Sequence, residues 1–186
     1  MVTITALWLP ILLAAVAVYI ASSLLHMVLP WHRNDYRGLP DEDRALATLR
    51  GLQLPEGNYH APHAVNAANT RDPAFAQKLQ QGPLLYLSIR AGGSMKLGPL
   101  LGQWFAYALV IAALSAYLCS RTVAAGADYL VVFRVAGFAT FLAYAGGQPI
   151  ESIWFSRDWS TSAKNIVDGL VYGLLTGGVF GWLWPR

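Results

Sequence analysis

Apolar residues run almost without interruption over four long stretches of the chain, separated by polar segments. The stretches cover residues 4–29, 97–120, 129–147 and 166–184. A hydrocarbon core about 30 Å thick needs about 20 apolar residues in a helix that rises 1.5 Å per residue. The pattern therefore predicts an all-α membrane protein built as a four-transmembrane-helix bundle.

The first stretch could instead be a cleaved signal peptide, which has a basic segment before a short apolar run. Residues 1–32 contain no Asp, Glu, Lys or Arg, and the apolar run is longer than that of a signal peptide. We therefore expect residues 1–30 to remain as transmembrane helix 1. Residues 31–97 then form a cytoplasmic insert, and residues 98–186 form helices 2–4.

The insert carries the signals of a small folded unit. An acidic start and a terminal glycine predict a helix over 41–51, and Asp72-Pro73 before Gly82 predicts a second helix. Residues 57–63 and 84–90 are expected to be extended and to form a two-stranded sheet. We therefore predict a small α+β insert with a thin core.

Composition strengthens the membrane interpretation. Hydrophobic residues make up 55% of the chain and charged residues 12%, whereas soluble domains carry roughly a quarter charged residues. This excludes a disordered chain and a highly charged nucleic-acid binder, so no nucleic-acid partner is expected. A disulfide scaffold is excluded because Cys119 is the single cysteine.

The basic residues predict an orientation. Ten Lys or Arg residues lie between helices 1 and 2 or between helices 3 and 4, whereas Arg121 and Arg186 lie on the other side. Positive charge concentrates on the cytoplasmic side of membrane proteins. We therefore expect a multi-pass protein of the bacterial cytoplasmic (inner) membrane with both termini on the outer, periplasmic side.

Small residues recur every fourth position along the fourth stretch. They are Gly169, Gly173, Gly177 and Gly181. Such a ridge lets two helix backbones approach closely in lipid. Its partner could be another subunit, or a row of small residues within the chain. Two such rows exist, one on the second stretch and one on the third: Ala108, Ala112, Ala116 and Ser120, and Ala139, Ala143 and Gly147.

All four histidines fall on the predicted cytoplasmic side, at His26, His32, His60 and His63. Imidazoles bind transition metals, so these residues are candidates for a metal or cofactor site. His26, at membrane depth, could also ligate a haem iron or a chlorin magnesium. The alternative is that the histidines form hydrogen bonds at the headgroup region. No cofactor is firmly predicted.

Five further residues are candidates for lipid or subunit contacts: Trp31, Arg33, Arg37, Arg134 and Asp168. Arg134 lies five residues into the third stretch, about 8 Å below the outer edge and within reach of the headgroups. Asp168 lies in the first turn of the fourth helix, where the helix dipole favours a carboxylate. The two lie on opposite sides of the bilayer and should not pair.

The chain resembles small uncharacterised bacterial four-helix integral membrane proteins of unknown function. The residues that carry this resemblance are 25–32, Pro62-His63, 144–147 and 181–186. The likeness implies a bacterial membrane location and no particular activity.

Signatures of catalysis are absent from the sequence, because it contains no GxSxG, Walker A, HExxH or GxGxxG motif. Few polar residues lie within the stretches, which argues against a transport path. We therefore expect a non-catalytic accessory subunit of a larger membrane complex, respiratory or photosynthetic, in contact with membrane lipids and other membrane-protein subunits. The alternative is a metal- or haem-handling membrane protein that uses the histidines.

Overall fold

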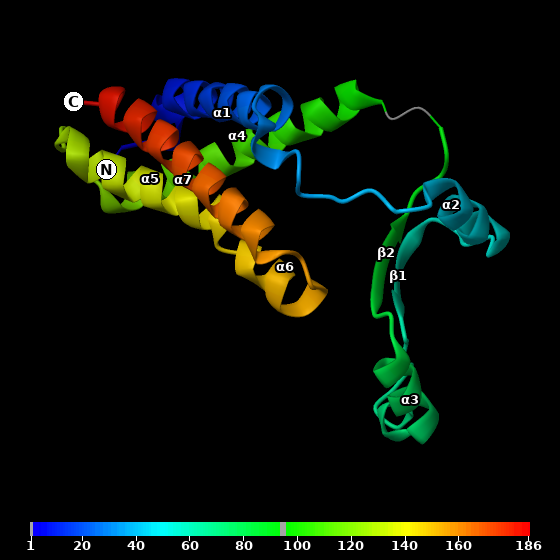
Figure 1. Ribbon diagram of the computed structural model, residues 1–186. Coiled ribbons are helices and arrows are strands. Elements are labelled where there is room, and N and C mark those ends of the chain that lie inside the picture. Colours follow the sequence, from blue (N-terminus) through cyan, green and yellow to red (C-terminus); the bar gives the residue numbers. More distant parts are fainter. Residues whose placement is uncertain (1, 94–95) are drawn as a thin grey trace. The chain divides into compact units, whose positions relative to one another are not determined.

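The computed structural model describes residues 2–93 and 96–186 and is mostly helical (Figure 1). The chain divides into two units. The helical unit comprises residues 1–37 and 96–186, and the insert unit comprises residues 38–95. Residues 31–37, which the sequence pattern assigned to the insert, thus group with the helical unit.

Five α-helices form the helical unit: α1 (Trp8–Ser23), α4 (Leu97–Thr122), α5 (Tyr129–Ala145), α6 (Gln148–Phe155) and α7 (Trp159–Trp182). A 3-10 turn, Ile4–Leu7, precedes α1, and a π-helical turn, Leu24–Val28, follows it. Three segments are long and apolar enough to cross a membrane, namely Ile4–Val28, Leu97–Thr122 and Tyr129–Phe155. These coincide with three of the four stretches that the sequence predicts to cross, so three of the predicted spans are helices compatible with a membrane.

The fourth expected span lies within α7, which has 24 residues and begins seven residues before the apolar stretch. It is not among the three segments that are apolar enough to cross, because Lys164, Asp168 and its glycines lower its mean hydropathy. The four-transmembrane-helix bundle is therefore not confirmed as a whole. The structure shows a mostly helical fold with three segments compatible with a membrane and a small two-stranded sheet.

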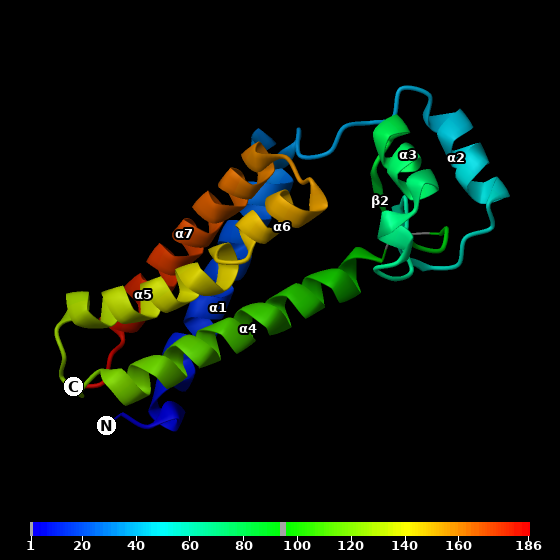
Figure 2. The ribbon, with the colours of Figure 1, turned by 90° about the horizontal axis from the view of Figure 1, so that it is seen from below.

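Helices α1, α4, α5 and α7 pack against one another in a closed arrangement (Figure 2). α1 contacts α4 and α7, α5 contacts α4 and α7, and the α5–α7 contact is the most extensive. The interior is lined by small side chains such as Ala15, Ala116 and Ala136, all fully buried. The row Ala108, Ala112, Ala116 and Ser120 on α4 lies in this interior.

The glycine ridge of α7 lies against α5. A Cβ atom added to Gly173 would lie 2.7 Å from the carbonyl oxygen of Gly137, and one added to Gly177 would lie 2.6 Å from that of Phe133. Gly169 faces Ala145 and Gly181 faces Tyr129 in the same way. The two backbones touch over the whole ridge, so the ridge has its partner within the chain.

The surface of α5 that meets this ridge differs from the expected row of Ala139, Ala143 and Gly147. It is formed instead by Tyr129, Phe133, Gly137, Phe141 and Ala145. These residues share a four-residue spacing, and Gly137 gives the room for close contact at the centre. Ala143 and Gly147 are exposed.

A short helix, α6, lies between α5 and α7 where the sequence pattern indicated a simple connection. Pro149 stands in its first turn, where its missing N–H costs no hydrogen bond. α6 ends at Phe155, and the residue that follows, Ser156, adopts a left-handed conformation with φ of 56°. The side chains of Ile150, Ile153 and Trp154 are exposed.

The insert unit matches its predicted elements. α2 (Glu42–Gly51) is capped by Asp41, and α3 (Pro73–Gln81) is capped by Asp72, whose carboxylate accepts from the backbone N–H of Ala74 at 2.8 Å. Strands β1 (Gly57–Ala61) and β2 (Leu85–Ile89) pair antiparallel, with Tyr59 opposite Leu87. All of its described residues are exposed or half-buried.

Both chain ends lie at the same end of the helical unit, beside the connection between α4 and α5 (Figures 1 and 2). The indole of Trp184 donates to the carbonyl oxygen of Ala124 at 2.8 Å, and the N–H of Gly126 donates to the carbonyl oxygen of Pro185 at 2.9 Å. α7 thus runs the length of the unit, and Asp168 lies toward its opposite end.

Candidate metal centre

The candidate site forms where the first apolar segment ends. α1 widens into the π-helical turn Leu24–Val28, which contains His26, and a 3-10 turn, Pro30–His32, follows. π-helical turns are rare and occur often at functional sites. The ring Nδ1 of His26 lies 3.1 Å from the carbonyl oxygen of Ser22, which leaves Nε2 free to face α7.

Asp168 of α7 is the buried carboxylate of the site, with a side chain 4% exposed. It lies in the third turn of α7 and not in the first, because that helix begins at Trp159. The expected stabilisation by the helix dipole therefore does not apply, since that effect fades beyond the first turn. Its charge must be balanced by its neighbours.

Two side chains from the segment after α1 bind this carboxylate. The indole N–H of Trp31 donates to Asp168 Oδ1 at 3.1 Å, and His32 Nε2 lies 2.8 Å from Asp168 Oδ2. These contacts join residues 136 and 137 positions apart. They explain why residues 31–37 belong to the helical unit.

A second carboxylate holds the other side of the His32 ring. Asp35 Oδ2 is hydrogen-bonded to His32 Nδ1, and Asp35 Oδ1 accepts from Lys164 Nζ at 2.6 Å. Burial acts to raise the pKa of Asp35, but the hydrogen bonds from Lys164 and His32 outweigh it and hold that pKa below its usual value. Asp35 is therefore ionised at neutral pH.

His26 completes the cluster. Its ring stacks on that of His32, with centroids 4.0 Å apart and planes 12° from parallel, and its Nε2 lies 3.8 Å from Asp168 Oδ2. One ligand atom from each of His26, His32 and Asp168 lies within 4.8 Å of the other two. Among the described residues, this is the one group of three His, Cys, Asp or Glu side chains close enough to hold a metal ion.

The three ligand atoms lie close enough together to surround an ion after a rearrangement of the His26 ring. With metal–ligand bonds of about 2.0–2.2 Å, two ligands of a tetrahedral metal lie about 3.3 Å apart. The 2.8 Å and 3.8 Å separations in the cluster lie on either side of that value. A metal lies in the plane of each imidazole that binds it, so the two stacked rings cannot share an ion as they stand. The His26 side chain is 46% exposed and free to tilt.

His32 decides what the cluster can do. With carboxylates at both nitrogens, its ring either carries a proton on each nitrogen or gives up the Nε2 proton to a metal. In the second case the bond from Nδ1–H to Asp35 is the usual support of a metal-binding histidine. Trp31 and Lys164 would then fix the two carboxylates.

A cavity of about 320 Å³ adjoins His26. Its wall includes Met27 and Trp104, and the indole of Trp104 donates to Ser22 Oγ at 2.7 Å. This volume is at the lower end of the range for small-molecule pockets. Its lining includes neither His32 nor Asp168, so the cavity lies beside the cluster and is not part of it.

His60 and His63 form a separate pair on the insert unit. Their ring nitrogens lie 2.9 Å apart across the end of β1, and the His60 ring stacks on that of Tyr86. His60 and His63 therefore belong to a different unit from His26 and His32. Each unit holds two of the four histidines, so neither unit by itself contains a site made by all four.

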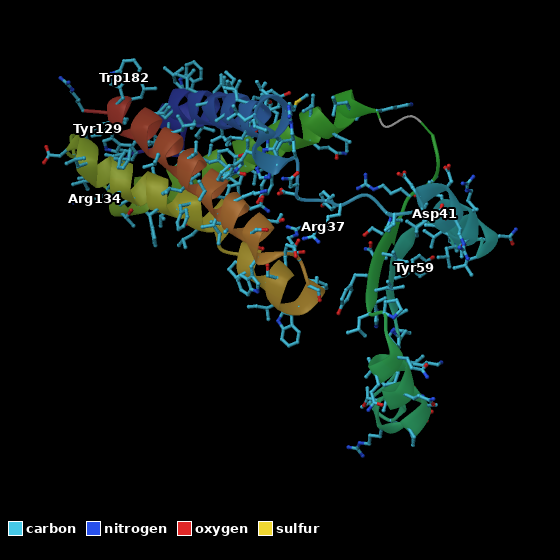
Figure 3. The ribbon with its side chains drawn as sticks, in the orientation of Figure 1. Arg37, Asp41, Tyr59, Tyr129, Arg134 and Trp182 are labelled. Carbon is cyan, nitrogen blue, oxygen red and sulfur yellow. The ribbon has the colours of Figure 1, made fainter. Side chains whose placement is uncertain are left out.

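The other expected contact residues are outside the cluster. Arg33 is exposed, and Arg37 lies 3.8 Å from Asp158 in a fully solvated pair. Arg134 is exposed on α5. Figure 3 shows it near Tyr129 and far along the unit from Arg37. The ion-pair partners of Asp168 are His26 and His32, and Arg134 is not among them.

Sequence reasoning missed Asp35 and Lys164. Two spacings carry the signal: Asp35 follows His32 by three residues, and Lys164 precedes Asp168 by four, so each pair shares one side of a turn. The predicted topology places both pairs at the same membrane edge. The two spacings and the shared edge together indicate that Asp35 and Lys164 belong to one cluster with His32 and Asp168.

Comparison of this chain with known protein families, curated proteins and solved structures found no match.

Proposed function

We propose that this protein is a membrane protein that binds a divalent transition metal, Zn²⁺ or Fe²⁺, through His26, His32 and Asp168. The observation that carries the proposal is the approach of these three side chains to within ligand range of one another. Two imidazoles and one carboxylate are a ligand set typical of zinc and of non-haem iron.

The surroundings of the three ligands support the proposal. Asp35 orients His32, and Trp31 occupies the Asp168 oxygen that faces away from the histidines. Metal ligands are commonly held by such outer hydrogen bonds. Three protein ligands leave a fourth position open for water or substrate, which distinguishes a reactive or transferable metal from a structural one.

Zinc titration by calorimetry in detergent tests the proposal. His26→Ala removes one exposed ligand and leaves the chain from Asp168 to Lys164 intact, so the variant should fold. We expect its Zn²⁺ affinity to fall by more than about 100-fold, because loss of an outer-shell partner alone costs about 10- to 100-fold, whereas His63→Ala should bind as the wild type does. Equal affinity of wild type and His26→Ala would refute the proposal.

We also propose that the site faces the cytoplasm of a bacterium, with the protein in the inner membrane and both termini in the periplasm. The distribution of Lys and Arg favours this orientation. The hydrogen bonds between the C-terminal residues and the α4–α5 connection support a fourth crossing by α7, because they hold its end opposite the end that carries Asp168.

A second candidate function is that of a non-catalytic accessory subunit of a larger membrane complex, of the respiratory or photosynthetic kind. The observation that favours it is the row of exposed apolar side chains on α6, Ile150, Ile153 and Trp154. Such a patch suits contact with a neighbouring membrane protein or with lipid, and the crosslink described next distinguishes the two.

A photo-crosslinking residue at Trp154 tests the second function. A crosslink to one defined membrane protein in the native membrane, lost when Ile153 is replaced by Glu, would support it. A monomer that crosslinks to lipid alone would refute it.

A further inference from the structure

A hollow with a volume of about 830 Å³ lies along α5 on the helical unit. Its walls come from α5, from α7 and from Leu118 of α4. All the lining residues but one are apolar, among them Phe138, Leu142 and Leu174, which are half-exposed or more. Most of its lining comes from the segment Tyr129–Phe155, which is long and apolar enough to cross a membrane, so we expect the groove to face hydrocarbon.

The single charged residue of the groove is Arg134. Its guanidinium has no ion-pair partner among the described residues. The nearest acidic residue along the helix is Asp128, six positions or about 9 Å of helix rise away. A cation at membrane depth without a counter-charge is costly, so it needs an anion from outside the chain.

Position along the helix fits an amphiphile. Arg134 lies about 8 Å from the start of α5, and the groove continues from it for about 12 Å of helix rise to Leu142. The cation thus lies at the headgroup side and the apolar walls extend toward the bilayer centre. A phospholipid has the same order, with its headgroup at the membrane surface and its acyl chains extending toward the bilayer centre.

We propose that this groove binds an anionic phospholipid, with the phosphate on Arg134 and one acyl chain along α5. Guanidinium and phosphate oxygens form paired, charge-assisted hydrogen bonds. The apolar walls exclude water from that contact, which strengthens it further.

A second copy of the chain fits the groove less well. A twofold interface at this face would bring Arg134 of each copy toward the other, because such an interface uses the same surface on both subunits. Like charges in a low-dielectric setting repel strongly. An apolar partner helix would leave the guanidinium buried without an anion.

Native mass spectrometry in a mild non-ionic detergent, after incubation with phosphatidylglycerol, tests the proposal. Arg134→Gln should lower the fraction of lipid-bound protein by about tenfold at a fixed lipid concentration. Ala139→Trp, which fills the groove and keeps the charge, should lower it as well. Arg121→Gln is the matched control, because Arg121 lies toward the same end but over the Tyr117 ring and outside the groove.

Three results would overturn the proposal. One is equal lipid retention by the wild type and Arg134→Gln. Another is an equal loss of retention in Arg121→Gln, which would indicate attraction by net charge alone. The last is a dimer that crosslinks through cysteines placed at Phe138 of each copy.

Discussion

His32 is the residue on which the cluster depends. Its ring lies between two carboxylates and stacks on His26, so it connects the end of α1 to α7 and to Lys164. Each nitrogen of the ring faces one carboxylate oxygen. Asp168, His32, Asp35 and Lys164 thus form one continuous chain of hydrogen bonds.

The pair of Asp35 and Lys164 should make stability depend on pH. Because the pKa of Asp35 is lowered in the folded protein, its contribution is present above the unfolded value of about 3.9 and is lost as pH falls through the lower native value. Asp35→Asn should cost about 1–3 kcal/mol at pH 6. Thermal unfolding in detergent should show this difference shrinking below about pH 4.

The control for this prediction is Asp158→Asn, whose pair with Arg37 is fully solvated and should contribute almost nothing. A difference between wild type and Asp35→Asn that stays constant down to pH 3 would contradict the prediction.

Two buried tyrosines give a second prediction. The hydroxyls of Tyr144 and Tyr172 are buried without a hydrogen-bond partner among the described residues, and their rings contact each other. An unpaired buried hydroxyl costs about 1–3 kcal/mol. Tyr172→Phe should therefore stabilise the protein by about 1 kcal/mol in equilibrium unfolding. Destabilisation by a similar amount would instead indicate that the hydroxyl binds an internal water.

At the level of elements, the contact of α5 with α7 depends on missing side chains. A methyl group at position 177 would meet a backbone oxygen at 2.6 Å, whereas one at position 178 would meet only Tyr129 Oη at 3.8 Å. Gly177→Ala should cost about 1–3 kcal/mol through overpacking. Gly178→Ala should be neutral or stabilising by up to about 1 kcal/mol, since alanine favours helix.

Unfolding of both variants in the same detergent measures the contrast, and each serves as the reference for the other. Equal stability of the two variants would contradict the prediction. It would show that α5 and α7 can move apart at Gly177 without a loss of stability.

Element positions were largely readable from sequence, because hydropathy and caps are local signals. Asp41 and Asp72 begin the two insert helices as their residue types predict. α6 was missed because eight residues are too few to show a helical period. The π-helical turn at His26 was missed because no residue type specifies an extra residue in a turn.

The candidate site was readable only in part. His26 and His32 were recognised by their chemistry, but Asp168 was assigned to a lipid or subunit contact. Its link to His32 joins positions 136 apart and depends on how α1 packs against α7. The local sequence pattern does not encode how α1 packs against α7. The glycine spacing of α7, by contrast, did indicate which surface of α7 would be covered.

For the whole molecule, the positions of the chain ends predict the topology. In a Cys119→Ser background, single cysteines at Thr48 and Ser156 should react with an impermeant thiol reagent only from the cytoplasmic side. A cysteine at Ala125 or Arg186 should react only from the periplasmic side. Labelling of Ser156→Cys and Arg186→Cys from one side would show that α7 does not cross the membrane.

The glycine contact between α5 and α7 has a consequence for biogenesis. A helix with Lys164, Asp168 and so many glycines gains little by partitioning from the translocon into lipid alone. Since α5 covers the whole ridge and leaves only α6 as a spacer, the last helix should leave the translocon together with α5, as a preassembled hairpin. Weakening that hairpin would then lower the yield of inserted protein before it affected the finished fold.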